Sequence, residues 1–478
     1  MAFKDLRDWI THLEQEDALK RVKTEVDWQC EIGTLTRIVR ESTGHALLFE
    51  NIKDYQQTRG RKLFTHFGRT PQLAMALGLH KDTPPVKLID HIRQGFKKRL
   101  KPVLLSSGPV KENILRGQDV NLYDFPVPQW NADDGGRYMN TQCGVVTRDP
   151  DTGWLNVGLY RGMIVDPKRI GVLMILTQHW GQHFAKYRQR GQRMPVAVFY
   201  GGEPILSFVA ATPAAPTGVC EYDIVGALCG EPVKLVKCET SDLLVPADAE
   251  IVVEGYIDPD PATFALEGPF REYTGYYSGP PSPKPVIQVE CITHRNDPIF
   301  EGGVGTATAH PGFRSISVSA FAWNLLEDTG VPGVTDVWCP PITAGKMVIA
   351  QIRKTYRGQP KQLAAALWGS AAAQDAFKHV MVVEEDIDIR NQAHLDWAMT
   401  FRINAAENDI VIFPGTPGSP LDPSIPAHER DVLRFGCGKW ARVLFDATRN
   451  WEHDSIPPDI RFVDRKEDLP RSWEEYGL

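Results

Sequence analysis

Residues 142–165 read QCGVVTRDPDTGWLNVGLYRGMIV, and this stretch decides the interpretation of the fold. Apolar runs lie on both sides of the segment Asp149-Pro150-Asp151-Thr152-Gly153, whose residue types favour tight turns. The pattern predicts strands over Gln142–Thr147 and Trp154–Val165, joined as a hairpin. Further strands are expected in the same region, at Val172–Leu176, Pro195–Tyr200, Pro232–Cys238, Glu250–Ile257 and Val286–His294. The middle of the chain is therefore predicted to be rich in short β-strands.

Two polar residues, Asn156 and Arg161, fall inside the second strand of this hairpin. Neither side chain is readily buried without a partner. Because they are an odd number of positions apart, a regular strand would point them to opposite faces of the sheet. If both serve one site, the strand has a kink or bulge at Gly158. The alternative is an edge strand whose polar side chains are solvated.

The pattern changes on both sides of the β-rich region. An amphipathic helix is predicted over Asp5–Val22, and Lys98–Pro109 has the composition of a linker. A helix over Gln178–Arg190, with Thr177 as its cap, follows the strand at Val172–Leu176. After residue 316, helices alternate with strands, which predicts a parallel α/β layer. The predicted helices of this layer are Ile316–Glu327, Gln359–Trp368 and Ala393–Arg402. Its predicted strands are Met347–Ile352, Val380–Val383 and Ile410–Phe413. A short helix is also expected at Trp473–Tyr476.

The composition excludes several classes of protein. Of the 478 residues, 42% are hydrophobic and 24% are charged, which is an ordinary globular balance. The formal net charge of −7 has the opposite sign to that of most proteins that grip nucleic acid. The eight cysteines form no CxxC pair, so a zinc knuckle is not expected. The cysteines are instead expected to be reduced thiols. Because the start of the chain has no apolar leader and no apolar run suffices for a membrane helix, a cytoplasmic protein is expected.

The most informative motif is EGPFREYTGYY, residues 267–277. Its carboxylates, Glu267 and Glu272, are five positions apart across a Gly-Pro turn. Carboxylates placed in this way can divide their roles, one ionised and ion-paired and the other kept protonated as an acid. The alternative is a solvated loop that contains two acids by chance. His179 and His183 are four positions apart on a predicted helix, so they are a candidate pair of metal ligands. The alternative is an ordinary pair of surface or core histidines.

Together these segments resemble the UbiD family of decarboxylases, in particular its aromatic-acid branch, which uses prenylated FMN. The resemblance spans roughly residues 3–475 and includes the opening helix and the stretch GEPVKLV at residues 230–236. It implies an α+β or α/β architecture, in which a split β-barrel flavin-binding domain lies between an α/β N-terminal region and a C-terminal α/β domain. The implied divisions are residues 1–110, 111–315, 316–445 and 446–478. The resemblance implies that the third division also mediates oligomerisation and that the fourth packs on a neighbouring protomer.

The resemblance also implies a metal site and a cofactor site. The family's Asn, His and Glu ligands, spaced by 23 and 42 positions, match Asn156, His179 and Glu221. These donors suit Mn²⁺ or Mg²⁺, which would bridge the cofactor phosphate. A potassium ion is implied beside Glu221, on backbone carbonyls around Val157 and Ala210–Thr212. The full set of implied prenylated-FMN contacts is Asn156, Leu159, Tyr160, Arg161, Thr177, Gln178, His179, Glu221 and Lys378.

The family's catalytic Glu–Arg–Glu trio matches Glu267, Arg161 and Glu272. The resemblance implies that Arg161 binds the substrate carboxylate and that Glu272 donates the proton that replaces CO2. Desolvation beside the flavin is expected to raise the pKa of Glu272. The implied reaction is the reversible, non-oxidative decarboxylation of an aromatic or heteroaromatic acid through a covalent adduct with the cofactor. Three further residues, His310, Arg314 and Ile316, match a substrate-facing stretch, and the alternative for the two polar ones is a solvated loop.

Two other functions remain open at this point. The chain can be a non-catalytic or partner-dependent subunit of a multi-subunit aryl carboxylase, although the intact trio argues against it. It can also be a plain FMN-binding oxidoreductase, although such sites do not ordinarily use a metal that bridges the phosphate. The resemblance implies a homodimer or higher homo-oligomer, a flavin prenyltransferase as the supplier of the cofactor, and no nucleic acid or membrane span.

Overall fold

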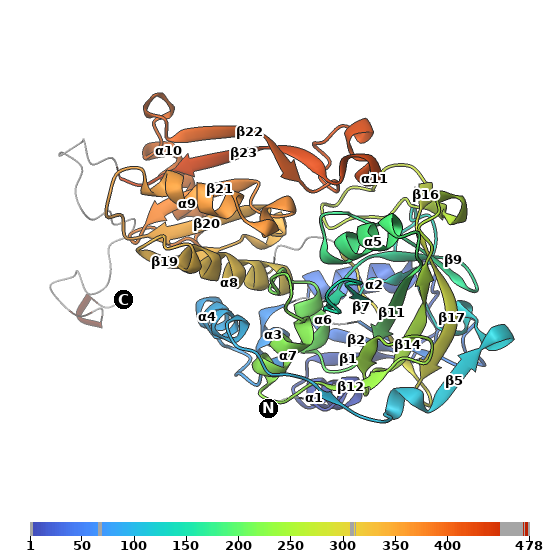
Figure 1. Cartoon of the computed structure of the whole chain (residues 1–478). Helices are drawn as coiled ribbons and strands as arrows, with labels where there is room; N and C mark the ends of the chain where they lie inside the picture. The colour runs from blue at the N-terminus through green and yellow to red at the C-terminus, as the bar shows by residue number, and fades with distance from the viewer. Residues whose placement is uncertain are drawn as a thin grey trace.

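The predicted hairpin forms one edge of the largest sheet (Figure 1). β7 (Gly144–Arg148) and β8 (Leu155–Gly158) pair antiparallel, with Thr147 opposite Asn156. The sheet has nine strands in the order β6-β9-β10-β17-β14-β11-β7-β8, with β5 added on β17. The remaining strands are β5 (Asn113–Arg116), β6 (Tyr138–Asn140), β9 (Gly162–Asp166), β10 (Arg169–Val172), β11 (Met194–Tyr200), β14 (Ile251–Ile257) and β17 (Val286–His294). This half-barrel sheet within a mixed α/β fold confirms the predicted fold class at that level.

The computed structural model describes residues 3–65, 69–305, 310, 312–449, 472 and 474–476. Within this part of the chain, the half-barrel is buried on both faces. Along β11, Val196, Val198 and Tyr200 belong to one hydrophobic core, whereas Ala197 and Phe199 belong to the other. This alternation follows from the two-residue period of a strand. None of the described helices combines the length and the apolar character that a membrane crossing requires.

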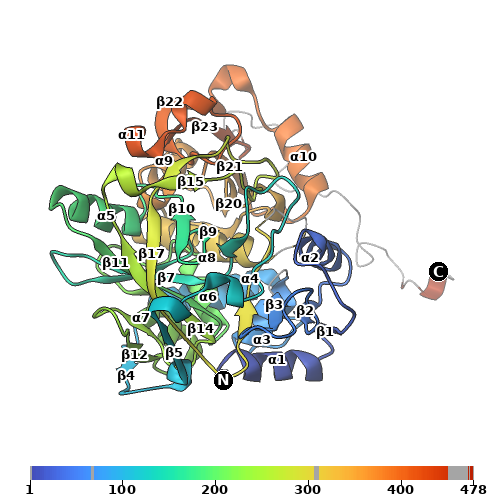
Figure 2. The same ribbon diagram turned by 90° about the vertical axis from the view of Figure 1, so that its right-hand side faces the viewer.

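The N-terminal region packs a small sheet beside the half-barrel (Figure 2). Its strands are β1 (Leu19–Val22), β2 (Ala46–Phe49), β3 (Lys62–Thr65) and β18 (Ile299–Glu301), and its helices are α1 (Leu6–Gln15), α2 (Glu31–Glu41), α3 (Thr70–Ala76) and α4 (Pro85–Phe96). The prediction of one helix over Asp5–Val22 is wrong in its second half. The helix ends at Gln15 because Asp17 adopts a left-handed conformation, with φ of 50°, that turns the chain into β1.

Two further predictions about local structure need correction. The strand expected over Val172–Leu176 ends at Val172, and Leu173 and Ile175 after it line a cavity described below. The linker predicted at Lys98–Pro109 contains β4 (Val103–Leu104), which pairs with β12 (Lys234–Lys237). β13 (Leu244–Pro246) completes that sheet, and β15 (Ala265–Glu267) pairs with β16 (Ser282–Lys284).

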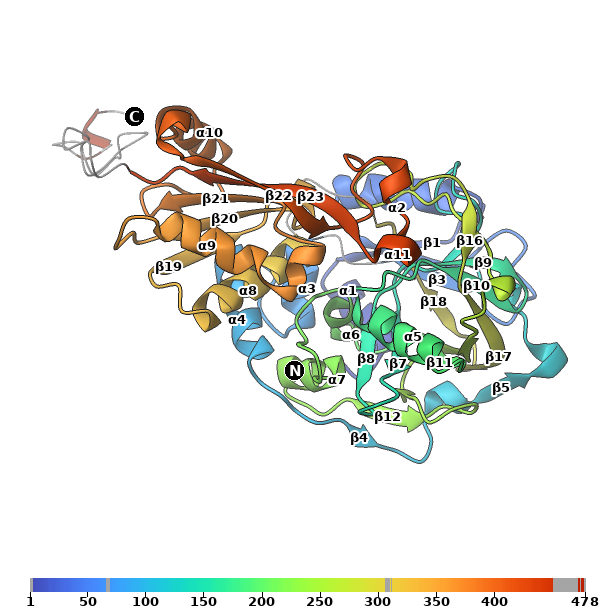
Figure 3. The ribbon, with the colours of Figure 1, turned by 45° about the horizontal axis from the view of Figure 1, so that its top comes forward.

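The C-terminal domain is a five-stranded sheet with helices against it (Figure 3). Its elements are α8 (Phe313–Asp328), β19 (Val334–Trp338), β20 (Met347–Ile352), α9 (Gln359–Trp368), β21 (His379–Glu384), α10 (Gln392–Phe401), β22 (Ile410–Gly418), α11 (Val432–Phe435) and β23 (Gly438–Asp446). β20 and β21 run parallel as predicted, but the third predicted strand, at Ile410–Phe413, lies in β22, which pairs antiparallel at one edge. The third parallel strand is β23, which was not predicted, and β19 pairs antiparallel at the other edge. The layer is therefore mixed rather than purely parallel.

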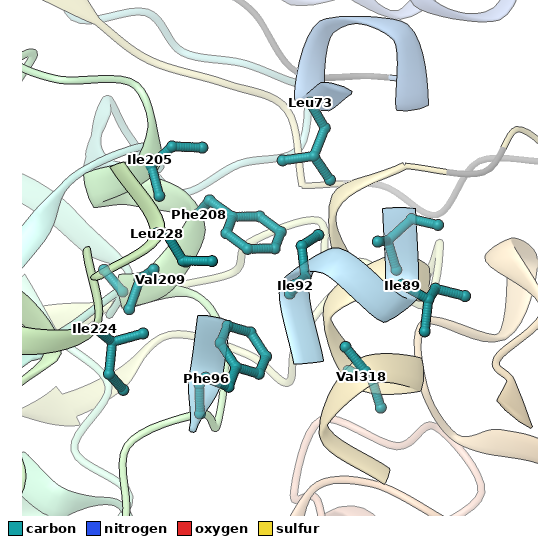
Figure 4. Packing of buried hydrophobic residues seen from close by; sticks show 14 of the residues in the cluster. Leu73, Ile89, Ile92, Phe96, Ile205, Phe208, Val209, Ile224, Leu228 and Val318 are labelled. Carbon is teal, nitrogen blue, oxygen red and sulfur yellow. The ribbon is translucent and has the colours of Figure 1, made fainter. Parts of the chain in front are cut away.

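Helices from all three regions meet in one hydrophobic core (Figure 4). The core contains side chains of α3, α4 and α8 together with α6 (Ile205–Ala210) and α7 (Glu221–Cys229). Ile92 and Phe96 of α4 lie between Leu228 of α7 and Val318 of α8 in this view. Burying such side chains stabilises the fold by about 1.5–3 kcal/mol each. Because α7 and α8 share this core, it fixes the position of the polar residues at their N-termini.

Candidate active site

A cavity of about 1110 Å³ lies where the half-barrel faces the C-terminal domain. The open end of β8, the N-termini of α7 and α8, and α5 (His179–Gln189) border this space. The predicted site residues that line it are Asn156, Leu159, Tyr160, Arg161, Thr177, Gln178, His179, Glu221, Glu272 and Arg314. A second hollow of about 800 Å³, between α4, α7 and α8, contains none of them. The first cavity is therefore the candidate active site.

The strand that carries Asn156 and Arg161 is broken, as the spacing of these residues predicted. β8 ends at Gly158 and β9 begins at Gly162, so Arg161 lies in the connection between them. A Cβ atom at Gly158 would lie 2.4 Å from the ring of Tyr160, a contact that only glycine avoids. The break brings Asn156 and Arg161 to the same cavity.

The predicted Glu–Arg–Glu trio is assembled at the cavity, which Arg161 and Glu272 line and Glu267 does not. Arg161 donates two hydrogen bonds to Glu267, from Nε to Oε1 at 3.1 Å and from Nη2 to Oε2 at 2.9 Å. Its Nη1 group pairs with Glu272. Tyr138 donates a further hydrogen bond to Glu267 Oε1 at 2.9 Å. Glu267 is thus held on both oxygens, whereas Glu272 is held on one.

Burial determines how these groups ionise. Glu267 is 1% exposed and Glu272 is 5% exposed. Burial raises the pKa of Glu272 above its ordinary value of 4.5, although Arg161 opposes this effect. Burial disfavours the charge on Arg161, but Glu267 and Glu272 outweigh it and raise the pKa of the guanidinium. The site combines a permanent cation with a carboxyl group disposed to keep its proton, as an acid catalyst requires.

The three predicted metal ligands line the same cavity from three elements. Asn156 lies on β8, His179 is the first residue of α5, and Glu221 is the first residue of α7. The amide nitrogen of Asn156 donates to the Tyr160 hydroxyl at 3.3 Å, which leaves the amide oxygen available. Glu221 Oε2 accepts from the backbone N–H of Val157 at 2.7 Å. Their binding to one ion stays a prediction.

The surroundings of these donors fit a divalent cation. Burial raises the pKa of Glu221 to about 8, since no cationic side chain in the described part of the chain compensates its charge. Burial also lowers the pKa of His179, which favours the neutral imidazole that binds metals. A carboxylate, an amide oxygen and an imidazole suit Mn²⁺ or Mg²⁺. Val157 and Ala210–Thr212, the predicted source of carbonyl ligands for potassium, line the cavity beside Glu221.

Other predicted residues lie elsewhere or have different neighbours. Lys378 is not among the lining residues, and its ammonium binds Asp422 Oδ2 and Ser424 Oγ, both at 2.8 Å. His310 Nε2 lies 3.2 Å from the backbone oxygen of Glu41, and the neighbouring residues 306–309 and 311 are outside the described part of the chain. Ile316 is fully buried in the core of α8 and does not line the cavity.

A charged cluster that sequence reasoning missed surrounds Arg314. Arg314 donates to the backbone oxygen of Ala344 at 2.7 Å and pairs with Asp375, whose other oxygen accepts from Lys346 at 2.8 Å. Burial disfavours ionisation of Asp375, but Lys346 and Arg314 outweigh it and lower the pKa of this carboxyl. Tyr273, the neighbour of Glu272, also lines the cavity beside the cluster. No local motif signals Asp375, because its partners are distant in sequence.

Comparisons with known proteins cover nearly the whole chain. Family models described as the N-terminal, Rift-related and C-terminal domains of 3-octaprenyl-4-hydroxybenzoate carboxy-lyase match residues 10–92, 101–307 and 313–447. A protein of Archaeoglobus fulgidus described as "Uncharacterized protein" is 32% identical over 496 residues, which cover 99% of each chain.

Solved structures give a consistent result. The closed form of the vanillic acid decarboxylase of Sedimentibacter hydroxybenzoicus is 30% identical, with a TM-score of 0.85 over 100% of this chain and 98% of that one. The enzyme HmfF of Pelotomaculum thermopropionicum, solved in complex with FMN, is 29% identical, with a TM-score of 0.80 over 96% and 97% of the two chains.

Proposed function

The chain belongs to the UbiD family of carboxy-lyases, and on this premise we propose that it reversibly decarboxylates an aromatic or heteroaromatic acid with prenylated FMN as cofactor. The observation that carries the proposal is the buried Glu267–Arg161–Glu272 trio beside a cavity large enough for a cofactor and a substrate. Vanillic acid, the substrate named for one solved relative, is aromatic, and HmfF has been solved with FMN and with the prenylated cofactor.

The substrate carboxylate is bound by Arg161. A guanidinium has five N–H donors, and the trio uses three of them. The remaining donors, on Nη1 and Nη2, are free to hold a carboxylate in two parallel hydrogen bonds. Glu267 and Tyr138 keep the guanidinium in place. The prenylated flavin would supply an electron sink for the loss of CO2.

Glu272 supplies the proton that takes the place of CO2. Its burial favours the protonated form, and a protonated carboxyl is held less strongly by Arg161 than a carboxylate is. The acid can therefore turn toward the substrate carbon once the carboxylate has left Arg161. In the reverse direction the same carboxylate accepts the proton, which makes the reaction reversible.

The cofactor phosphate is assigned to the part of the cavity that Asn156, His179 and Glu221 line. Asn156, His179 and Glu221 would hold Mn²⁺ or Mg²⁺ there, and the potassium ion would lie on the nearby carbonyls. The N-terminus of α5, beside Thr177 and Gln178, adds an electrostatic preference for phosphate through the helix dipole. Lys378 stays a proposed cofactor contact, although Asp422 binds its ammonium in this structure.

The function is tested by loading the chain with prenylated FMN from a flavin prenyltransferase, the proposed supplier of the cofactor. Absorbance and mass spectra of the bound flavin identify the cofactor. The loaded chain is then mixed with phenolic, heteroaromatic and saturated aliphatic acids, and CO2 release is measured. We expect release from aromatic acids only. A loaded chain that releases no CO2 by itself, but does so with a partner protein, would instead show a partner-dependent subunit.

The rate of decarboxylation should fall as the pH rises. Glu272 donates only when protonated, so turnover is full below its pKa and declines tenfold per pH unit above it. Because burial raises that pKa above 4.5, the decline should begin at a higher pH than for an exposed glutamate. Initial rates with saturating substrate at several pH values test this, with circular dichroism as a control for folding. A rate that rises with pH would contradict the assignment.

We also propose the division into residues 1–110, 111–315, 316–445 and 446–478. β18 pairs with β3, so the first two regions share a sheet across their boundary. The last region was predicted to pack on a neighbouring protomer, and residues 450–471 of it lie outside the described part of the chain.

A homodimer or higher oligomer is proposed to form through the C-terminal domain. β22 is an edge strand, and Ile412 and Phe413 on it are 66% and 53% exposed. Exposed apolar edge strands favour association. Ile412→Lys should shift the protein toward the monomer in light scattering after size exclusion. Leu104→Lys, at a residue 65% exposed on β4, is the matched control. An unchanged mass in Ile412→Lys would exclude this interface.

A further inference from the structure

The indole of Trp154 lies where the three elements that carry the proposed metal ligands meet. Trp154 precedes Asn156 by two residues. Its ring packs edge-to-face on His179, with centroids 4.8 Å apart and an interplanar angle of 72°. Its Nε1 group donates to the backbone oxygen of Val219 at 2.9 Å, two residues before Glu221. One side chain is therefore linked to the segments of all three ligands.

The ring contact restricts the orientation of His179. Trp154 also packs on His183, one turn later on α5, with centroids 5.0 Å apart and an interplanar angle of 88°. Edge-to-face contacts of this kind prefer a defined ring geometry and contribute beyond the buried area. Since the indole touches two imidazoles on the same face of α5, it restrains both the position of the helix and the ring plane of His179.

A polar contact of His183 links this group of rings to the strand that pairs with β8. His183 is 1% exposed, and its Nδ1 atom lies 2.9 Å from Thr147 Oγ1. Thr147 is the residue directly opposite Asn156 in the β7–β8 ladder. The indole that contacts His179 thus also packs on the histidine that is bonded to the partner strand of Asn156.

The hydrogen bond to Val219 acts on the third ligand. Glu221 begins α7, so the backbone just before it sets the direction in which its side chain enters the cavity. The N–H group of Trp154 fixes that backbone at the carbonyl of Val219. Losing this donor would leave the carbonyl without the indole as a partner and would loosen the start of α7.

We propose that Trp154 is a positioning residue that holds Asn156, His179 and Glu221 in the geometry to bind one divalent cation. The inference rests on the metal site of the proposed function. Residues that orient metal ligands from outside the coordination sphere commonly change metal affinity by 10–100-fold when they are replaced. Trp154 is only half-buried, so its effect on metal affinity should exceed its effect on folding.

The experiment measures Mn²⁺ affinity and not turnover. The whole chain is complexed with FMN and titrated with Mn²⁺, and the free ion is quantified by its electron paramagnetic resonance signal. Trp154→Leu removes the ring contact and the N–H donor, and its dissociation constant for Mn²⁺ should rise about 10–100-fold. Trp154→Phe keeps an aromatic ring but removes the donor, and about a fivefold rise is expected.

Trp28→Phe is the matched control. Trp28 is also half-buried, and its Nε1 group donates to Asp54 at 3.1 Å, away from the cavity. This variant loses the same kind of hydrogen bond but should bind Mn²⁺ with wild-type affinity. Thermal unfolding without metal shows how much each substitution costs the fold itself. If Trp154→Leu does not fold, the fivefold effect in Trp154→Phe decides the matter.

Glu221→Gln separates failure of the inference from failure of the metal site. If Glu221→Gln loses Mn²⁺ binding and both folded Trp154 variants keep wild-type affinity, Trp154 is not a positioning residue. If Glu221→Gln also keeps wild-type affinity, the proposed metal site is itself wrong, and the role of Trp154 falls with it. An intermediate affinity in Trp154→Phe, between those of wild type and Trp154→Leu, would support the separate contributions of ring and donor.

Discussion

Glu272→Gln should lower turnover by about 10²–10⁴-fold while the chain still folds and binds its flavin. Glutamine is nearly isosteric with glutamate, and its amide can still meet the guanidinium of Arg161, so the cavity keeps its shape. The amide cannot donate a proton as a carboxylic acid does. The chemical step that follows loss of CO2 therefore lacks its acid.

The measurement that separates this role from a structural one is solvent-deuterium incorporation at the product carbon. With Glu272→Gln, incorporation and turnover should fall together, while flavin affinity, measured by fluorescence quenching, stays at the wild-type level. Glu272→Asp is the matched control, because it keeps the carboxyl group but shortens its reach, and it should recover part of the activity. Near wild-type turnover in Glu272→Gln would move the proton donor to Glu267 or to a water molecule.

Arg161→Ala should reduce kcat/KM by about 10²–10⁴-fold, through both weaker substrate binding and a lower rate. The loss corresponds to two charge-assisted hydrogen bonds of about 1.5–3 kcal/mol each. Since this anchor holds the carboxylate before and during its departure, KM should rise and kcat should fall together. Steady-state kinetics with an aromatic acid test this expectation.

Removing Arg161 also affects the two carboxylates that it neutralises. Glu267 and Glu272 would remain buried without their cation, and leaving a buried charge unpaired costs about 3–5 kcal/mol. Arg161→Lys is the matched control: it keeps the charge, and with it most of the stability, but it cannot bind a carboxylate with two parallel hydrogen bonds. If Arg161→Lys retained full kcat/KM, charge alone rather than geometry would account for substrate binding.

The elements that sequence predicted well are those with one dominant local signal. β20 has the predicted bounds of Met347–Ile352 because its apolar run is short and is buried in the interior of a sheet. The break after Gly158 was inferred from the odd spacing of Asn156 and Arg161, which a regular pleat does not allow. The helix at Asp5–Val22 was overextended because one left-handed residue, Asp17, leaves almost no trace in the hydrophobic pattern.

The candidate site was predictable where its residues share a segment and not where they meet only in space. Glu267 and Glu272 lie in one motif, so their spacing made them a candidate pair, with a solvated loop as the alternative. Their assembly with Arg161 was implied only by the family resemblance. The cluster of Arg314, Lys346 and Asp375 depends on the packing of α8 against distant loops, and no local pattern indicates it. Trp154 was overlooked for the same reason: its contacts with His179 and Val219 are made between elements.

The lining of the cavity comes from different parts of the chain, and this has a consequence for protein engineering. Arg161 and Glu272, which handle the carboxylate and the proton, come from the half-barrel region, whereas Arg314, Asp375 and Leu421 come from the C-terminal domain. Because α8 joins the shared core through apolar side chains such as Val318, that domain can be recombined with a relative's while the core contacts are kept. Chimeras of this kind offer a way to change the substrate range while the residues of the catalytic trio are kept.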